Sequence, residues 1–391
     1  MSEIRVDIRE LKNTIAKMNL AIENSKLNPK SGWIEVETTK DNKMTIKVAN
    51  YDYYLLATVG LCGDEITEEN SIHATVTAET FIPLVSKLED EFVTISERMN
   101  ALVFNTGKAE YTFPIIKEMG KVKSIDTIEF NSVRSNRVKL SGENVASVAN
   151  SNAKGLVNAI FSRDIQQFVY FDNGGAITFT DNIYLNDFGR EVAEGAEPEF
   201  KILLNATQAK LLKVFEGYEE VEVIVAEEDD YSSARKCQLV SVPDNIKLTL
   251  IVQSLEMTDK FPSIKLRNLA SSVSETHAII NKKALEKALA RLMVFDKKFD
   301  ITVLNYSKFV WGEDSVTLVS IKNKNYEVVP YVSGTNTTTH ESVIRFADVV
   351  NQLKAITTNE IDISYGDSPA IVINSDGLKQ LIPEVIDRSK S

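Results

Sequence analysis

One pattern of hydrophobic and polar positions recurs three times along the chain. From Lys201 to Ala226, apolar residues first alternate with polar ones, then recur every three or four positions, and then alternate again. Alternation is typical of a strand with one buried face, and the wider spacing is typical of an amphipathic helix. The same strand, helix and strand pattern is repeated from Ser71 to Ser96 and from Val343 to Tyr365.

The three copies are separated by about a third of the chain. The corresponding positions Leu88, Phe215 and Leu353 lie 127 and 138 residues apart in a chain of 391 residues. An internal repeat of more than about 100 residues indicates a duplicated domain rather than a solenoid unit. We therefore expect three tandem domains. Their expected boundaries are 1–130, 131–270 and 271–391.

A helix and a hairpin precede each copy of the pattern. Helical spacing predicts helices at 7–22, 142–158 and 281–293, and Asp7 and Asn281 are suitable N-caps. The hairpins are predicted at 33–49, at 168–179 around Asn173-Gly174, and from Lys308 onward. The joints between thirds are expected at Lys117–Arg137 and Lys260–Glu275. This order of elements predicts an α+β fold.

Composition places the chain among globular proteins. Hydrophobic residues make up 43% and charged residues 26%, as in soluble domains. The sequence has no run of about 18 apolar residues, and Met1–Arg9 lacks an apolar signal core. The two cysteines, Cys62 and Cys237, fit a reducing compartment. We therefore expect a cytoplasmic protein without a membrane partner.

Charge is distributed unevenly between predicted loops and predicted helices. The formal net charge is −12, and the acidic residues gather in predicted loops and strand ends. A single lysine on an exposed helix face usually serves only solubility. Here the helices are rich in cations while the chain is anionic, which favours a surface that holds a polyanion without reading its sequence. The helix cations are Arg9, Lys12, Lys17, Lys87, Lys154, Lys210, Lys213, Lys283, Lys287, Arg291 and Lys354.

Three tandem domains of this size, each with two helices on a curved sheet, resemble the bacterial sliding clamp, the beta subunit of the replicative DNA polymerase. Phe179–Leu185 resembles the family segment Thr-Asp-Gly-His-Arg-Leu, and Lys260–Ile264 resembles Arg-Phe-Pro-Asp-Tyr. Leu381–Val385 stands where the family ends in an apolar-apolar-Met-Pro-Met type sequence. The sequence departs from the family at Asn182-Ile183-Tyr184 and at Glu384, which fits a phage or mobile-element clamp and leaves the partner preference open.

The resemblance implies a non-catalytic processivity factor. In that family two subunits close head to tail into a six-domain ring around duplex DNA, and a pocket tethers the polymerase and the clamp loader by short peptides. No cofactor or metal is implied. The resemblance adds Lys26 and Lys30 to the DNA-facing cations. It assigns the peptide pocket to Thr180, Tyr184, Leu185, Pro262, Leu266, Leu381, Ile382, Pro383 and Val385. It assigns the dimer interface to Leu88, Tyr111, Phe113, Met293, Val294 and Phe295.

Two other classes of function stay open on the residues alone. A metal-dependent DNA-processing enzyme would need paired carboxylates, and Asp229-Asp230 is a candidate pair, although acidic runs are usually solvated loops. A repeat-built structural or interaction protein would not use DNA. The three histidines are not in metal-ligand spacing with the cysteines, and no Cys-x-x-Cys occurs. We expect a non-enzyme.

Overall fold

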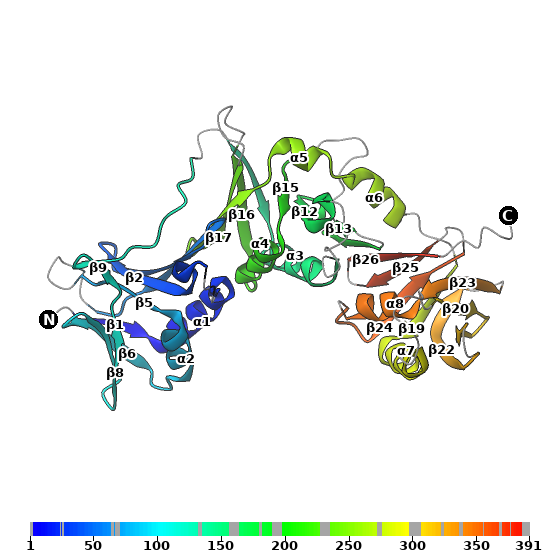
Figure 1. Ribbon diagram of the computed structural model, residues 1–391, viewed down its shortest axis with the longest axis horizontal. Coiled ribbons are helices and arrows are strands. Elements are labelled where there is room, and N and C mark those ends of the chain that lie inside the picture. The colour runs from blue at the N-terminus through cyan, green and yellow to red at the C-terminus, as the bar shows by residue number, and fades with distance from the viewer. Residues whose placement is uncertain are drawn as a thin grey trace. The chain divides into compact units, whose positions relative to one another are not determined.

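The structure is a computed structural model (Figure 1) in which helices pack on antiparallel sheets, as the α+β prediction requires. Its contacts divide the chain into two compact units, residues 1–146 with 210–255 and residues 147–209 with 256–391. The structure describes residues 3–23, 25, 27–63, 66, 71–131, 135–155, 164–179, 182–189, 198–226, 235–271, 276–296, 306–321, 324–335, 339–354, 356–366, 370–375 and 377–384.

The first unit contains two larger sheets and one small hairpin among the described residues. One sheet has the order β1 (Glu3–Asp7), β6 (Phe92–Arg98), β7 (Ala101–Asn105), β8 (Glu110–Pro114). The other has the order β11 (Ser135–Leu140), β16 (Glu220–Ala226), β17 (Arg235–Val242), β18 (Ile246–Val252), β4 (Tyr53–Gly60), β3 (Lys43–Ala49), β2 (Trp33–Thr39), β5 (His73–Thr77). The hairpin is β9 (Lys117–Glu118) with β10 (Lys121–Val122). The helices are α1 (Ile8–Met18), η1 (Asn19–Ala21), η2 (Pro29–Gly32), α2 (Ala78–Lys87) and η5 (Leu212–Phe215).

The described strands of the second unit form one long antiparallel sheet. Its order is β15 (Lys201–Leu204), β12 (Val169–Asp172), β13 (Gly175–Phe179), β14 (Ile183–Asp187), β26 (Leu378–Pro383), β25 (Ala370–Ser375), β24 (Glu360–Ser364), β19 (His277–Asn281), β22 (Tyr326–Thr335), β21 (Ser315–Ser320), β20 (Tyr306–Trp311), β23 (His340–Arg345). Its helices are η4 (Asp164–Gln167), α6 (Ser263–Ser271), α7 (Lys282–Asp296) and α8 (Phe346–Leu353). Three helices begin in one unit and end in the other: α3 (Gly142–Gly155), α4 (Ala206–Leu211) and α5 (Leu255–Asp259).

The three repeats of strand, helix and strand are confirmed. They are β5–α2–β6, β15–α4–η5–β16 and β23–α8–β24. The predicted caps are also confirmed, since Asp7 Oδ1 accepts the Glu10 N–H at 3.0 Å and Asn281 Oδ1 accepts the Ala284 N–H at 3.0 Å. The expected joint Lys260–Glu275 contains the helix α6, which the sequence pattern did not predict. The three domain boundaries stay a prediction.

Each main helix buries the face that its sequence pattern predicts. In the first unit α1 packs against α2 and buries four apolar side chains, and in the second unit α7 packs against α8 and also buries four. Burying each such side chain contributes roughly 1.5–3 kcal/mol. The buried residues are Ile8, Leu11, Ile15 and Met18 in α1 and Leu285, Ala288, Leu289 and Leu292 in α7. None of the helices within the described ranges is long and apolar enough to cross a membrane.

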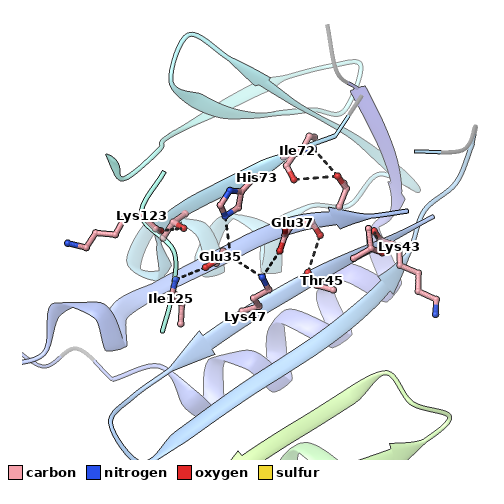
Figure 2. Close-up of polar contacts among 12 residues, drawn as sticks. Glu35, Glu37, Lys43, Thr45, Lys47, Ile72, His73, Lys123 and Ile125 are labelled. Atoms are coloured by element: carbon pink, nitrogen blue, oxygen red, sulfur yellow. Dashed lines mark hydrogen bonds and ion pairs between the residues drawn. The ribbon is translucent and has the colours of Figure 1, made fainter. Parts of the chain in front are cut away.

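A charged cluster lies on the face of the eight-stranded sheet that is opposite to α1 (Figure 2). Its centre is Glu35, whose side chain is only 3% exposed. Glu35 Oε1 accepts hydrogen bonds from Lys47 Nζ at 2.9 Å and from His73 Nε2 at 3.2 Å, and Oε2 accepts the Ile125 N–H at 2.5 Å. The carboxylate therefore fastens the chain after β10 to the sheet.

These bonds decide the charge of Glu35. Burial disfavours the carboxylate, but the hydrogen bonds from His73, the Ile125 N–H and Lys47 outweigh burial and lower the pKa of Glu35 to about 2. The hydrogen bond to Glu35 in turn raises the pKa of His73. The cluster is therefore built around an ionised carboxylate.

We expect Glu35→Gln to lower the free energy of unfolding at pH 7 by about 3 kcal/mol, because it leaves Lys47 and the Ile125 N–H beside a neutral group. Urea unfolding measures this loss. The matched control is Glu37→Gln, whose carboxylate also pairs with Lys47 but is 42% exposed, and we expect a loss below about 1 kcal/mol. Equal losses in the two variants would contradict the role given to Glu35.

A second prediction concerns the pH dependence of the same cluster. Because the pKa of folded His73 is raised, its stabilisation is fully present below its ordinary pKa of about 6.5 and is lost as the pH rises through the folded value. The Glu35 contribution behaves oppositely, since it is lost only as the pH falls from about 4.5 toward 2. Urea unfolding between pH 6 and 9 should show a decline of up to about 1 kcal/mol that is absent in His73→Gln.

Candidate nucleic-acid and partner-binding sites

The cations of α1 differ in how they are engaged. Arg9 is exposed, whereas Lys12 Nζ donates to the Leu88 carbonyl at 3.0 Å. Lys17 Nζ donates to the Glu216 carbonyl at 3.3 Å and lies 3.9 Å from the centre of the Tyr218 ring. Burial lowers the pKa of Lys17 although Glu216 opposes the shift. Lys17 is therefore committed to its own unit, and Arg9 is available.

The other predicted cations of the first unit also fall into two groups. Lys30 is ion-paired with Asp126, and Lys213 lies 3.9 Å from the Glu216 carboxylate. Lys87 and Lys210 are exposed and make no ion pair or hydrogen bond with any described residue. Lys26 lies outside the described residues, as does the side chain of Lys154.

The stripe predicted on α7 lines a groove against β22. Lys283, Lys287 and Arg291 border a space of about 340 Å³ together with Val328 and Pro330. Arg291 donates two hydrogen bonds to the Glu327 carboxylate, from Nε to Oε1 at 2.7 Å and from Nη2 to Oε2 at 2.8 Å. Both lysines are exposed and have no bonded partner in the part of the chain that the structure describes. On α8, Lys354 is exposed and donates to Asn351 at 3.3 Å.

Several predicted pocket residues meet on one face of the sheet at the β14–β26 pair. Leu185, Leu266 and Leu381 belong to a single apolar cluster, which α6 covers. Pro262 precedes α6 and is partly buried, and Pro383 ends β26 and is exposed. The residues assigned to the pocket thus come from β14, β26 and the segment that contains α6, and their role as a peptide pocket stays a prediction.

Other predicted pocket residues do not lie on that face. In the β14–β26 register Ile183 opposes Leu381 and Tyr184 opposes Gln380, so that Tyr184 points away from Leu185. Ile382 belongs to the core under α7 and α8. Tyr184 and Ile382 therefore lie on the other side of the sheet from Leu185 and Leu381, because adjacent residues of a strand face opposite sides. Their assignment to the peptide pocket stays a prediction. Thr180 and Val385 lie outside the described residues.

A buried ion pair positions α6. Arg267 Nη2 lies 2.7 Å from Asp172 Oδ1, which also accepts the N–H groups of Gly174 and Gly175 at 2.8 and 3.0 Å. Burial raises the pKa of Asp172, although the Arg267 guanidinium opposes the shift. Removing one partner of such a buried pair costs about 3–5 kcal/mol. Arg267 thus ties the helix to the β12–β13 turn.

Sequence reasoning missed the aromatic part of this site. Phe261 stacks on Tyr170 at 4.9 Å and contacts Phe179 edge to face at 5.3 Å between ring centres. Phe261 adjoins the predicted Pro262, and Phe179 ends the predicted hairpin strand. Both aromatic residues stand next to polar residues, which is typical of side chains with one buried face. This pattern does not show that Phe261 and Phe179 would contact each other, because it does not predict which elements are neighbours.

The predicted interface residues divide by exposure. Leu88 and Phe113 are each only 4% exposed, and Phe113 packs edge to face on Phe81 and Phe104. Val294 and Phe295, at the end of α7, are 60% and 51% exposed. Tyr111 and Met293 are partly buried. The first two residues therefore offer little surface, and the end of α7 offers more.

Among the described residues, no group of three or more His, Cys, Asp or Glu is arranged to hold a metal ion. Asp229-Asp230 lies outside the described residues. Buried Cys237 is surrounded by apolar groups, and burial raises the pKa of its thiol to about 12. It is therefore a poor nucleophile.

Comparison with known proteins gives a uniform result for the fold. No protein-family model and no curated protein sequence matches the chain. Among solved structures, the DNA polymerase III beta subunit of Thermotoga maritima superposes with a TM-score of 0.73 at 17% identity, over 98% of this chain and 99% of that one. The beta subunit of Streptococcus pyogenes gives 0.70 at 16% identity, with the same coverage of 98% and 99%. The DNA polymerase sliding clamp of Bacillus subtilis gives 0.68 at 14%, again over 98% and 99%. The chain therefore has the fold of the bacterial sliding clamp, the beta subunit of DNA polymerase III.

Proposed function

We propose that this chain is a DNA polymerase processivity factor, a non-catalytic clamp that encircles and slides on duplex DNA in the cytoplasm. The observation that carries the proposal is the superposition of nearly the whole chain on whole beta subunits, at 98% and 99% coverage. A shared single domain would not give this result.

The ring would close through strand edges. β8 is the last strand of its four-stranded sheet, and Tyr326–Pro330 of β22 pairs on one side only, with β21, among the described strands. Exposed strand edges invite pairing with another chain. Tyr326 and Val328 are 67% and 52% exposed. In a head-to-tail dimer, β8 of one subunit pairs with β22 of the next, with Val294 and Phe295 as apolar contacts.

The grip on DNA would be electrostatic and diffuse. Lys283 and Lys287, with Arg9, Lys87 and Lys210, are the predicted DNA-facing cations without an intramolecular partner in the described chain. Phosphate contacts of this kind carry no sequence information and allow sliding. The apolar cluster that α6 forms with β14 and β26, which contains Leu185, Leu266 and Leu381, would hold peptides from the polymerase and the clamp loader. A docked peptide raises the effective concentration of polymerase at the primer end.

The direct test is retention on DNA of two shapes. With a matching clamp loader and ATP, the protein should stay on closed circular DNA through gel filtration and leave the same DNA after linearisation. The double variant Val294→Glu with Phe295→Glu should elute as a monomer and be lost from both. The control Ile264→Glu changes a residue of similar exposure, 65%, and should remain dimeric. Equal retention on circular and linear DNA would refute the ring.

A further prediction concerns the lysines of α7. We expect Lys283→Gln with Lys287→Gln to reduce the slope of log affinity against log salt on duplex DNA by up to about 2, because each lost phosphate contact removes about one unit. Fluorescence anisotropy between 50 and 200 mM salt measures the slope. The control Lys12→Gln changes a lysine already bonded to the Leu88 carbonyl and should alter the slope less. Equal slopes in all three proteins would remove Lys283 and Lys287 from the DNA surface.

A further inference from the structure

A small cavity opens on the face of the β14–β26 pair that is opposite to α6. Its volume is about 100 Å³. This is more than the roughly 30 Å³ that a water molecule occupies in the liquid, and it approaches the roughly 150 Å³ of a cavity that holds benzene. Because the cavity opens to one side, it has room for the edge of a flat ring. The lining residues are Ser147, Asn150, Tyr184, Asn186, Ile356, Thr357, Ser375 and Leu378.

The chemistry of the lining is polar but uncharged. Hydroxyl and carboxamide groups come from α3, β14, β25 and the chain after α8, and Ile356 and Leu378 add apolar surface. A charged ligand would lose its hydration here without meeting an opposite charge, at a cost of several kcal/mol. A neutral ligand with both donors and acceptors would meet partners. The cavity therefore selects against ions.

Tyr184 gives the strongest indication of a ligand. Its side chain lines the cavity although the residue is only 2% exposed, and its hydroxyl makes no hydrogen bond with any described residue. Burial raises the pKa of Tyr184, so the hydroxyl stays a donor at neutral pH. The hydroxyl faces the cavity, so a donor or acceptor bound there can pair with it.

Asn186 adds a second fixed group. Its Nδ2 donates to Ser147 Oγ at 2.7 Å, which orients the carboxamide and leaves Oδ1 without a partner among the described residues. Asn side chains pair with the donor and acceptor edge of bases, and a phenol is a common neighbour of base rings. We propose that this cavity binds a nucleobase, supplied either by a free nucleoside or by an unpaired base of DNA. This site lies apart from the α6 face and does not depend on ring closure.

Fluorescence of 2-aminopurine tests the proposal in the full-length protein. We expect the protein to quench the fluorescence of 2-aminopurine riboside in a saturable manner. The same should hold for a short DNA single strand that contains 2-aminopurine. Tyr184→Phe removes only the hydroxyl and should weaken binding about fivefold. Leu378→Trp fills the cavity from a partly exposed position and should abolish binding. The control Tyr365→Phe removes a buried hydroxyl of the neighbouring core and should change nothing.

The two sources of the base are separated by competition. If unlabelled adenosine displaces the strand, the free nucleoside is a sufficient ligand. If only the strand binds in a Tyr184-dependent manner, the ligand is an unpaired base in DNA. The proposal is overturned if neither probe shows Tyr184-dependent quenching, or if propionamide competes as well as adenosine. Retention of Tyr184→Phe on closed circular DNA should be normal, so failure of this proposal is distinct from failure of the ring.

Discussion

Backbone pairing between strands that are distant in sequence is the constraint on which the structure depends. In the first unit β18 pairs with β4, from Ile246 opposite Ala57 to Leu250 opposite Tyr53. In the second unit β14 pairs with β26 in the same antiparallel manner. Each pairing satisfies N–H and C=O groups that would otherwise form an open edge, which is costly when buried and prone to aggregation when exposed. A repeated module thus becomes a continuous sheet.

The register of the β14–β26 pair decides which chemistry lies on each face. With Ile183 opposite Leu381, the apolar side chains at 183, 185 and 381 face α6, and Tyr184 and Gln380 face the other way. A slip of one residue would exchange the two faces. The Arg267–Asp172 pair holds α6 against the first face, and Gln380 Nε2 donates to the Gln352 carbonyl of α8 at 3.1 Å on the second. One register therefore supports both proposed binding sites.

Hydrophobic periodicity predicted most helices and strands, because the residues that form each pattern lie close together in the sequence. The α7 pattern and its Asn281 cap needed no knowledge of distant residues. α6 escaped prediction because its apolar residues divide between two faces: Leu266 and Ala270 are buried, while Ile264 and Leu269 are 65% and 43% exposed. Its stability rests on Arg267 and the β12–β13 turn, which lie far apart in sequence. Leu88 and Phe113, assigned to the interface, are each only 4% exposed, and nothing local in the sequence separates an interface residue from a core residue. Glu35 is the converse case. It alternates with the buried Ile34 and Val36 and so points to the other face of the sheet, where the distant Ile125 segment covers it.

The distribution of ion pairs bears on how the proposed clamp would hold DNA and still move. The chain carries a net charge of −12, and several helix cations are already engaged: Lys17 with the Glu216 carbonyl and Tyr218, Lys30 with Asp126, and Arg291 with Glu327. A cation held by a carboxylate contributes less to counterion release than a free one, because its field is already compensated. The free lysines would then provide a weak, even attraction, and the carboxylates would limit it. If the proposed ring holds DNA topologically, a low affinity per contact is an advantage, because each strong contact would have to break at every step of sliding.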